Sequence, residues 1–181
     1  TEDTGGQSTA VGVQALRLQN NDAANYNTAV GYNAGGAVTT GVQNTLIGGL
    51  AGDAITTSDF TVAVGYSAVT SATTGHSNSA LGRHALKSTT TGSQNVAIGR
   101  DALEANTTGD DNVGVGFHAL VANTTGTLNV AVGMNAVDAN TTGDKNTGIG
   151  QGALSQNTTA DDNTAVGFAA LNANTTGAEN T

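Results

Sequence analysis

The sequence of 181 residues contains no cysteine, no proline and no tryptophan. Without cysteine the chain can form neither a disulfide framework nor a metal site with thiolate ligands. It also lacks an apolar run of membrane length and the pattern of a secretion signal, so we expect no membrane insertion of this segment. These absences exclude the disulfide-rich and membrane-spanning classes.

Basic residues are also scarce. Five Lys and Arg stand against 14 Asp and Glu, which gives a formal net charge of -9. Nucleic acid is therefore not an expected partner, because binding its phosphates requires clustered Lys and Arg. Charged residues make up only 10% and aromatic residues 3% of the chain, which is unlike a typical enzyme core. Aliphatic residues nevertheless recur in register, which argues against disorder.

Glycine is abundant, and it marks a repeat of 17 residues. The clearest copy, residues 95–111, reads NVAIGRDALEANTTGDD, and the pattern restarts at residue 112. Copies begin at residues 8, 27, 44, 61, 78, 95, 112, 129, 146 and 163, and the first is two residues longer. We predict one continuous array over 8–179, with 1–7 as the end of a preceding coil and 180–181 as the start of a further coil. A fixed short period predicts coils that are stabilised by their neighbours, and we expect a fragment of a longer fibre.

Within the repeat, numbered 1 to 17 from its first residue, position 4 is always aliphatic and position 5 is always glycine. This pattern predicts a short strand that ends in a turn. Position 8 is always Ala and position 9 is mostly Leu or Val, which predicts a second apolar segment, either a short strand, which we favour, or a single helical turn. Positions 12–15 are typically Asn-Thr-Thr-Gly, which predicts a second corner, because Asn and Gly tolerate left-handed backbone angles. The predicted fold class is all-β, a parallel β-solenoid of about ten coils at ~4.8 Å per coil.

Position 3 is small and apolar in nearly every copy. Side chains alternate along a strand, so if position 4 faces inward, position 3 faces outward. An outward column of small apolar residues predicts contact with another chain. This predicted self-association stripe consists of Ala29, Ala63, Ala80, Ala97, Gly114, Ala131, Gly148 and Ala165. The alternative is a flat coil that buries position 3 inside itself.

The core of the repeat, as in Thr28-Ala29-Val30-Gly31 and Val96-Ala97-Ile98-Gly99, resembles the head repeats of YadA-like trimeric autotransporter adhesins. Similar runs occur in bacteriophage tail-fibre proteins, and the resemblance covers essentially the whole chain. It implies a left-handed parallel β-roll, a homotrimer, an extracellular location and a surface that binds host proteins or glycans. This chain departs from the family in its longer repeat and its Asn-Thr-Thr-Gly corner.

A search for sites in the sequence predicts no catalytic, cofactor or metal site. Residues 114–119 and 148–153 match the pattern G-x-G-x-x-A of nucleotide-binding loops, but the strand restarts every 17 residues and leaves no room for the required helix. His84 and His118 share position 7 two coils apart, about 9.6 Å by stacking, which is too far for one metal. No carboxylate recurs beside them. Acidic residues such as Asp110 and Asp111 are expected to solvate the surface rather than to bind calcium.

Five Asn-Thr-Thr corners match the glycosylation sequon, at Asn106, Asn123, Asn140, Asn157 and Asn174. The favoured interpretation is a ladder of stacked amides along the solenoid. In total, the sequence predicts a non-enzymatic extracellular fibre, an adhesin or a tail-fibre-like attachment protein. One alternative is a filament or sheath component that polymerises end to end without binding a receptor, and a minor alternative is an ice- or glycan-binding solenoid.

Overall fold

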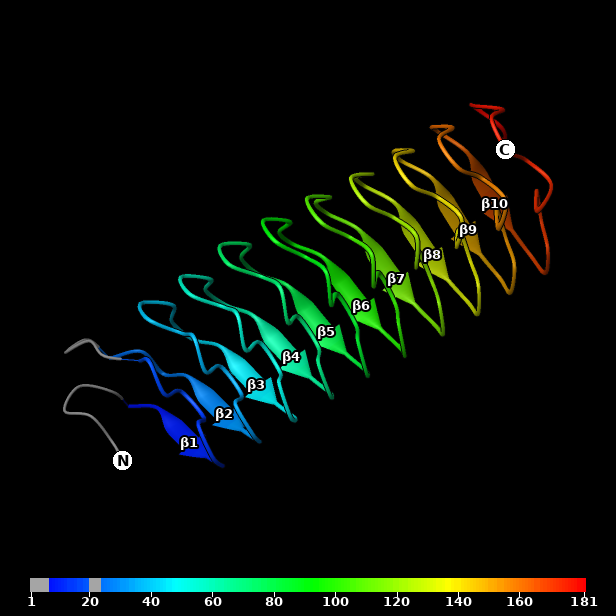
Figure 1. Cartoon of the computed structure of the whole chain (residues 1–181). Coiled ribbons are helices and arrows are strands. Elements are labelled where there is room, and N and C mark those ends of the chain that lie inside the picture. The colour runs from blue at the N-terminus through cyan, green and yellow to red at the C-terminus, as the bar shows by residue number, and fades with distance from the viewer. Residues whose placement is uncertain (1–6, 20–23) are drawn as a thin grey trace.

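The computed structural model describes residues 7–19 and 24–181, which form a β-solenoid with one strand in each coil (Figure 1). The ten strands form a single parallel sheet in chain order, which confirms the predicted fold class. The strands are β1 (Thr9–Val11), β2 (Thr28–Val30), β3 (Thr45–Ile47), β4 (Val62–Val64), β5 (Ser79–Leu81), β6 (Val96–Ile98), β7 (Val113–Val115), β8 (Val130–Val132), β9 (Thr147–Ile149) and β10 (Thr164–Val166). Residues 1–6 and 20–23, which hold most of the predicted preceding coil and part of the longer first coil, lie outside the described residues.

Each strand pairs with the next one in strict register. Val96 pairs with Val113 and Ile98 with Val115, so every residue of β6 faces the residue 17 positions further along the chain. The same holds from β2 to β10, and β1 pairs with β2 across the longer first coil. Each position of the repeat therefore forms a column that runs along the solenoid, and β1 and β10 lie at opposite ends of it (Figure 1).

The strand faces the interior with position 3, not with position 4. Ala97 is fully buried, whereas Ile98 beside it is 41% exposed. The interior is too narrow for a branched residue at position 3 in the later coils, since a Cβ added to Gly148 would lie 2.5 Å from Val137 Cγ2. The flat coil is therefore confirmed, and the predicted self-association stripe is wrong. All eight of its members are buried inside their own chain: Ala29, Ala63, Ala80, Ala97, Gly114, Ala131, Gly148 and Ala165.

The second segment of the coil is neither a strand nor a helical turn, so this detail of the prediction is wrong. It is a run of turns in which positions 7 and 9 both have left-handed backbone, as at Asp101 (φ 59°) and Leu103 (φ 52°). Asp101 N–H donates to Arg83 of the preceding coil, whereas Leu103 N–H donates to Ala119 of the following coil. The segment therefore still hydrogen-bonds to both neighbouring coils. In a regular strand, the N–H groups of two residues that are two positions apart point to the same neighbour, whereas those of Asp101 and Leu103 point to opposite neighbours, so the segment is not a strand.

The Asn-Thr-Thr-Gly corner does not use the left-handed backbone that its Asn and Gly would tolerate. Left-handed backbone outside the second segment occurs at position 17, as at Asp111 (φ 56°), and not at the Asn or Gly of the Asn-Thr-Thr-Gly corner. Position 5 has the more demanding conformation. Gly99 has a φ of 129°, and a Cβ added to it would lie 2.5 Å from the carbonyl oxygen of Gly116. Glycine is required there by both backbone conformation and the close approach of the next coil.

Candidate functional site

The asparagines of the Asn-Thr-Thr corners form a buried ladder. Asn123 Nδ2 donates to Asn106 Oδ1 at 2.9 Å and to the carbonyl oxygen of Gly126 at 3.0 Å. The predicted ladder is confirmed. Because a glycan would be attached to Nδ2, burial excludes the alternative, glycosylation of the folded chain, at the four corners whose Asn is fully buried: Asn106, Asn123, Asn140 and Asn157. Asn174, in the last corner, is less buried and still donates to Asn157 at 3.2 Å.

A second ladder runs along position 1, to which the sequence analysis assigned no role. Asn95 Oδ1 accepts from both the backbone N–H and the side-chain amide of Asn112, at 3.0 and 3.2 Å. Asn112 Nδ2 also donates to Gly126 at the end of its own coil, at 2.8 Å. This side chain therefore closes its coil and joins it to the preceding one. The recurrence of Asn at the start of the repeat was the signal for this role.

The acidic residues at position 16 also link coils. Asp110 Oδ1 accepts from the backbone N–H of Ser93 at 2.7 Å, and Asp144 Oδ1 accepts from that of Thr127 at 2.7 Å. In both pairs the donor lies 17 residues earlier. Besides carrying surface charge, these carboxylates thus stabilise the stacking, which the sequence analysis did not anticipate.

The position-4 side chains form an exposed apolar column along β1 to β10, here called the apolar stripe. Its members are Val11, Val30, Ile47, Val64, Leu81, Ile98, Val115, Val132, Ile149 and Val166. Eight of these ten side chains are more than a third exposed, from 36% at Val30 to 68% at Val166. Position 2 lies on the same face of the sheet and carries Thr, Ser or Val, of which Val62 is 39% exposed. A continuous apolar column of this length is typical of a contact surface rather than of a solvated one.

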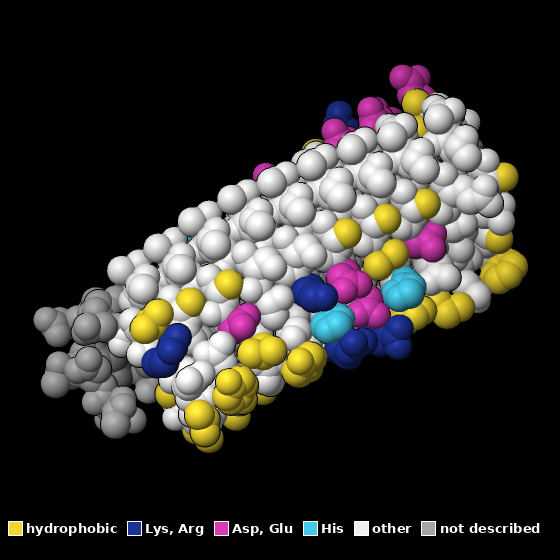
Figure 2. All heavy atoms as spheres, viewed as in Figure 1, with side chains coloured by type: hydrophobic (Ala, Val, Ile, Leu, Met, Phe, Trp, Pro, Cys, Tyr) yellow, Lys and Arg dark blue, Asp and Glu magenta, His cyan; other side chains and the backbone are white. Residues whose placement is uncertain are grey.

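A group of charged and histidine side chains lies on the face of the second segment, with hydrophobic side chains along the same edge on both sides of it (Figure 2). The group, here called the charged cluster, comprises Arg83, His84, Lys87, Arg100, Asp101, Glu104 and His118. It contains three of the five Lys and Arg residues of the chain. Since positions 6, 7 and 10 of three successive coils form this cluster, the stacking register brings it together.

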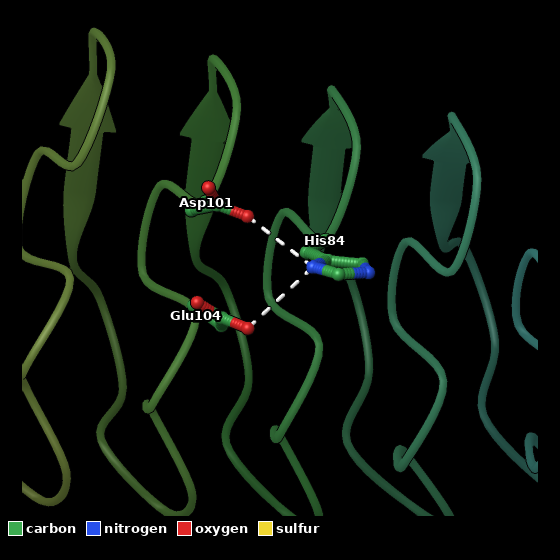
Figure 3. Close-up of side chains that lie close together, drawn as sticks. All are labelled: His84, Asp101 and Glu104. Carbon is green, nitrogen blue, oxygen red and sulfur yellow. Dashed lines mark ion pairs between the residues drawn. The ribbon is translucent and has the colours of Figure 1, made fainter.

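Asp101 lies at the centre of the charged cluster. Its Oδ1 is 3.3 Å from His84 Nδ1 and its Oδ2 is 3.5 Å from His118 Nε2. The expectation that no carboxylate accompanies these histidines is therefore wrong, because the coil between them carries Asp at the same position 7. Glu104 Oε1 lies 3.6 Å from His84 Nδ1, and both carboxylates point toward that imidazole (Figure 3).

Three cations surround the two carboxylates. Arg100 Nε donates to Asp101 Oδ2 at 2.6 Å, Arg83 Nη1 lies 4.0 Å from Asp101 Oδ1, and Lys87 Nζ lies 3.5 Å from Glu104 Oε1. Burial acts to raise the pKa of Asp101. The hydrogen bond from Arg100 and the charges of Arg100, His84 and Arg83 outweigh it, so the pKa lies below the ordinary value of 3.8. Asp101 is therefore ionised at neutral pH.

Aromatic rings extend this surface. Phe117 stacks on His118 with ring centroids 3.7 Å apart, and the Arg100 guanidinium lies 4.6 Å from the Phe117 centroid. Tyr66, two coils before Arg100 in the same position-6 column, is 55% exposed. Position 6 thus offers exposed rings and guanidinium groups side by side, which are side chains suited to binding planar, polar ligands.

The chain matches no family model, no curated protein and no solved structure. In the part that the structure describes, no helix has the length and apolar character needed to cross a membrane. The basis for a functional proposal is therefore the molecule's own geometry, in which the repeated positions form the scaffold and the apolar stripe and the charged cluster form distinct surfaces.

Proposed function

We propose that this chain is a segment of a non-enzymatic, extracellular attachment fibre whose copies associate side by side through the apolar stripe, most simply as a homotrimer. The observation that carries the proposal is the exposed Val, Ile and Leu column along the whole sheet. It takes the place of the position-3 column, which is buried. The resemblance of the repeat core to trimeric adhesin heads and tail fibres supports the same assembly.

The energetics favour lateral contact along the full length. Covering one half-exposed Val, Ile or Leu contributes about 1 kcal/mol, so ten contribute on the order of 10 kcal/mol. This amount is comparable to the roughly 4–15 kcal/mol that association costs in lost freedom of motion. A short overlap would therefore not hold. Because all copies share the 17-residue register, an in-register parallel contact covers every member of the stripe at once.

The surface left free by such an assembly would carry the attachment function. Positions 6, 7 and 10 vary from coil to coil, and at position 6 Tyr32, Tyr66 and Phe168 are each more than half exposed. We propose that a host surface protein or glycan binds there. In the alternative, a filament or sheath without a receptor, these positions would bind nothing.

Sedimentation velocity over a range of concentrations tests the assembly. We expect a trimer, and we expect I98D and V132D to yield a folded monomer, because each places a charge in the stripe at an exposed site. Thr108→Asp is the matched control, since it adds the same charge at an exposed corner position outside the stripe. A wild-type chain that stays monomeric at all concentrations would contradict the assembly.

Binding to immobilised matrix proteins and a glycan array tests attachment. We expect retention that falls when Tyr66 and Phe117 are replaced by Ala, with the circular dichroism spectrum and the assembly unchanged. Retention of no ligand, together with micrographs of filaments that lengthen by end-to-end addition, would support the filament alternative instead.

A further inference from the structure

The charged cluster contains three side chains of the type that bind metals. His84 lies at position 7 of one coil, and Asp101 and Glu104 lie at positions 7 and 10 of the next. One ligand atom from each lies within 4.8 Å of the other two, and this is the one such group of His, Asp and Glu found in residues 7–19 and 24–181. Figure 3 shows both carboxylates reaching across the gap between the coils toward the imidazole.

The distances match those of a tetrahedral zinc site. With bonds of about 2.0–2.1 Å, two ligand atoms of a tetrahedral zinc lie about 3.3–3.4 Å apart. His84 Nδ1 is 3.3 Å from Asp101 Oδ1 and 3.6 Å from Glu104 Oε1. His84 and Asp101 thus already have the ligand spacing. The ligand atoms of Asp101 and Glu104 lie within 4.8 Å of each other. Glu104, whose side chain is 31% exposed, must therefore turn toward Asp101 to complete a face of the tetrahedron.

The surrounding cations decide how well a metal can compete. Arg100 binds the far oxygen of Asp101, Oδ2, and holds the carboxylate in place with Oδ1 directed at His84. Arg83 Nη1 lies 4.0 Å from Oδ1 and also competes with a metal, but its side chain is 53% exposed and can turn away. Lys87 competes for the very oxygen of Glu104 that faces His84, at 3.5 Å. Its side chain is 41% exposed, so it can turn into solvent when a divalent ion arrives. The ion pair between Lys87 and Glu104 therefore weakens metal binding without blocking it.

We propose that His84, Asp101 and Glu104 bind one divalent transition-metal ion, with Zn²⁺ the best match, and that the ion cross-links two adjacent coils. One imidazole nitrogen and two carboxylate oxygens form a donor set that zinc accepts, with water in the fourth position. Calcium requires six to eight oxygen ligands, which this cluster does not supply. The proposal does not depend on the proposed attachment function.

A related set of residues lies two coils further along and supplies an internal comparison. His118, Asn135 and Asp138 occupy the same three positions as His84, Asp101 and Glu104. Asn135 Oδ1 and Asp138 Oδ1 are buried and have no hydrogen-bond partner. The positions of the competing cations carry apolar residues here, namely Phe117, Val121 and Met134. One substitution, N135D, would therefore place one imidazole and two carboxylates at the same three positions without the cations, with Asp138 one methylene shorter than Glu104.

Isothermal titration calorimetry tests the proposal. Zinc chloride is added to the full chain after treatment with a chelator. We expect one zinc per chain, a higher melting temperature with zinc, and no binding of calcium under the same conditions. H84Q and E104Q should each weaken binding by at least about tenfold. K87Q should strengthen it, and N135D should raise the stoichiometry to two. Circular dichroism establishes that each variant is folded.

H76Q is the matched control, because His76 is also paired with an aspartate, Asp59, at 3.9 Å, but has no second carboxylate. It should leave zinc binding unchanged. No zinc binding by the wild-type chain would overturn the proposal. So would binding that H84Q and E104Q leave intact, or that H76Q reduces as much as they do, since these outcomes indicate adventitious zinc on surface histidines.

Discussion

Two stretches of the solenoid fill the same interior with different side chains. In the N-terminal coils, residues 27–60, position 9 is glycine, at Gly35 and Gly52. In the C-terminal coils, residues 95–162, position 9 is a buried Leu or Val, and the first of these is Leu103. The strands nevertheless pair in the same register in both stretches. The coil shape is therefore compatible with two different cores.

In the N-terminal coils, side chains at other positions fill the space that Leu or Val at position 9 occupies in the C-terminal coils. A Cβ added to Gly52 would lie 2.8 Å from Leu46 Cδ2 and 2.9 Å from Ile55 Cδ1, so these two side chains occupy the space. The C-terminal coils show the converse, since position 3 is Gly114 or Gly148 where a neighbouring Leu or Val fills the interior. The interior is therefore filled from positions 3, 9 and 12 in different combinations, as tolerant cores allow.

The two stretches also differ in how they hold the corner at positions 12–15. Position 12 carries the buried apolar residues Val38 and Ile55 in the N-terminal coils and the amide ladder from Asn106 onward in the C-terminal coils. Position 5 is glycine in both stretches and position 8 is Ala in both. The comparison separates what the backbone requires from what merely fills space.

The largest effect is expected where the two stretches agree. Gly48→Ala and Gly99→Ala should each destabilise the chain by about 3 kcal/mol or more, because the added Cβ meets a carbonyl oxygen at 2.5 Å and φ is near 130°. Urea denaturation followed by circular dichroism measures this. Gly152→Ala is the control, since no atom lies within 4 Å of its added Cβ and other coils carry non-glycine residues at that position. A clear difference between the Gly48 and Gly99 variants would show that the backbones are not equivalent.

The second prediction converts one core into the other. Leu46→Ala should cost about 2–5 kcal/mol through the cavity it leaves, and Gly52→Leu about 1–3 kcal/mol through overpacking. Leucine fits the backbone there, because Gly52 has a φ of 59° and Leu103 at the same position has 52°. The double variant should lose less stability than the two single variants lose in sum, by more than about 1 kcal/mol. A double-mutant cycle measures this difference. Strict additivity would contradict the exchange of volume.

The sequence predicts the coil length, the strands and the glycine turn, because each depends on residues that lie close together within one coil and recur in every coil. It does not predict which face of the strand is buried. Ile98 is larger and more hydrophobic than Ala97, so hydrophobicity alone assigns Ile98 to the interior, whereas Leu103 and its equivalents already fill the space that a large side chain on the inner face of the strand would need. How much space remains depends on how closely two segments approach across the coil, and a single repeat does not reveal that distance.

The charged cluster was missed for a different reason. The sequence places His84 and His118 two coils apart, about 9.6 Å by stacking. The neighbour that matters is Asp101, which the stacking register places between them. A comparison of residues at the same repeat position in adjacent coils predicts this contact, whereas a comparison of the histidines with each other does not.

The third prediction addresses the corner that differs between the stretches. Asn123→Ala should destabilise the chain by about 1–3 kcal/mol, because it removes the donor to Asn106 Oδ1 and leaves a buried acceptor unpaired. Asn174→Ala should cost under about 1 kcal/mol, since the last corner is more exposed and its bond to Asn157 is long, at 3.2 Å. Thermal unfolding measures both. Equal losses would indicate that the amides act through local backbone conformation rather than through the ladder.

The smallest effect concerns three aspartates and their pH dependence. Burial raises the pKa of Asp53 in the N-terminal coils and of Asp138 in the C-terminal coils above 3.8, whereas that of Asp101 is lowered. A raised folded-state pKa means that stability falls as pH rises from 3.8 through that value, so D53N and D138N should each stabilise the chain at pH 7 and remove this fall. The lowered pKa of Asp101 contributes stability above pH 3.8 that is lost as pH falls below it, so D101N should destabilise at pH 7 by about 1 kcal/mol. Urea denaturation between pH 3 and pH 7 distinguishes the two signs. Asp53 and Asp138 both occupy position 10, but their coils have different cores. Equal changes in the stability of D53N and D138N would show that the outer surface is independent of the core. A change in only one of them would show that core packing affects the environment of the surface carboxylate.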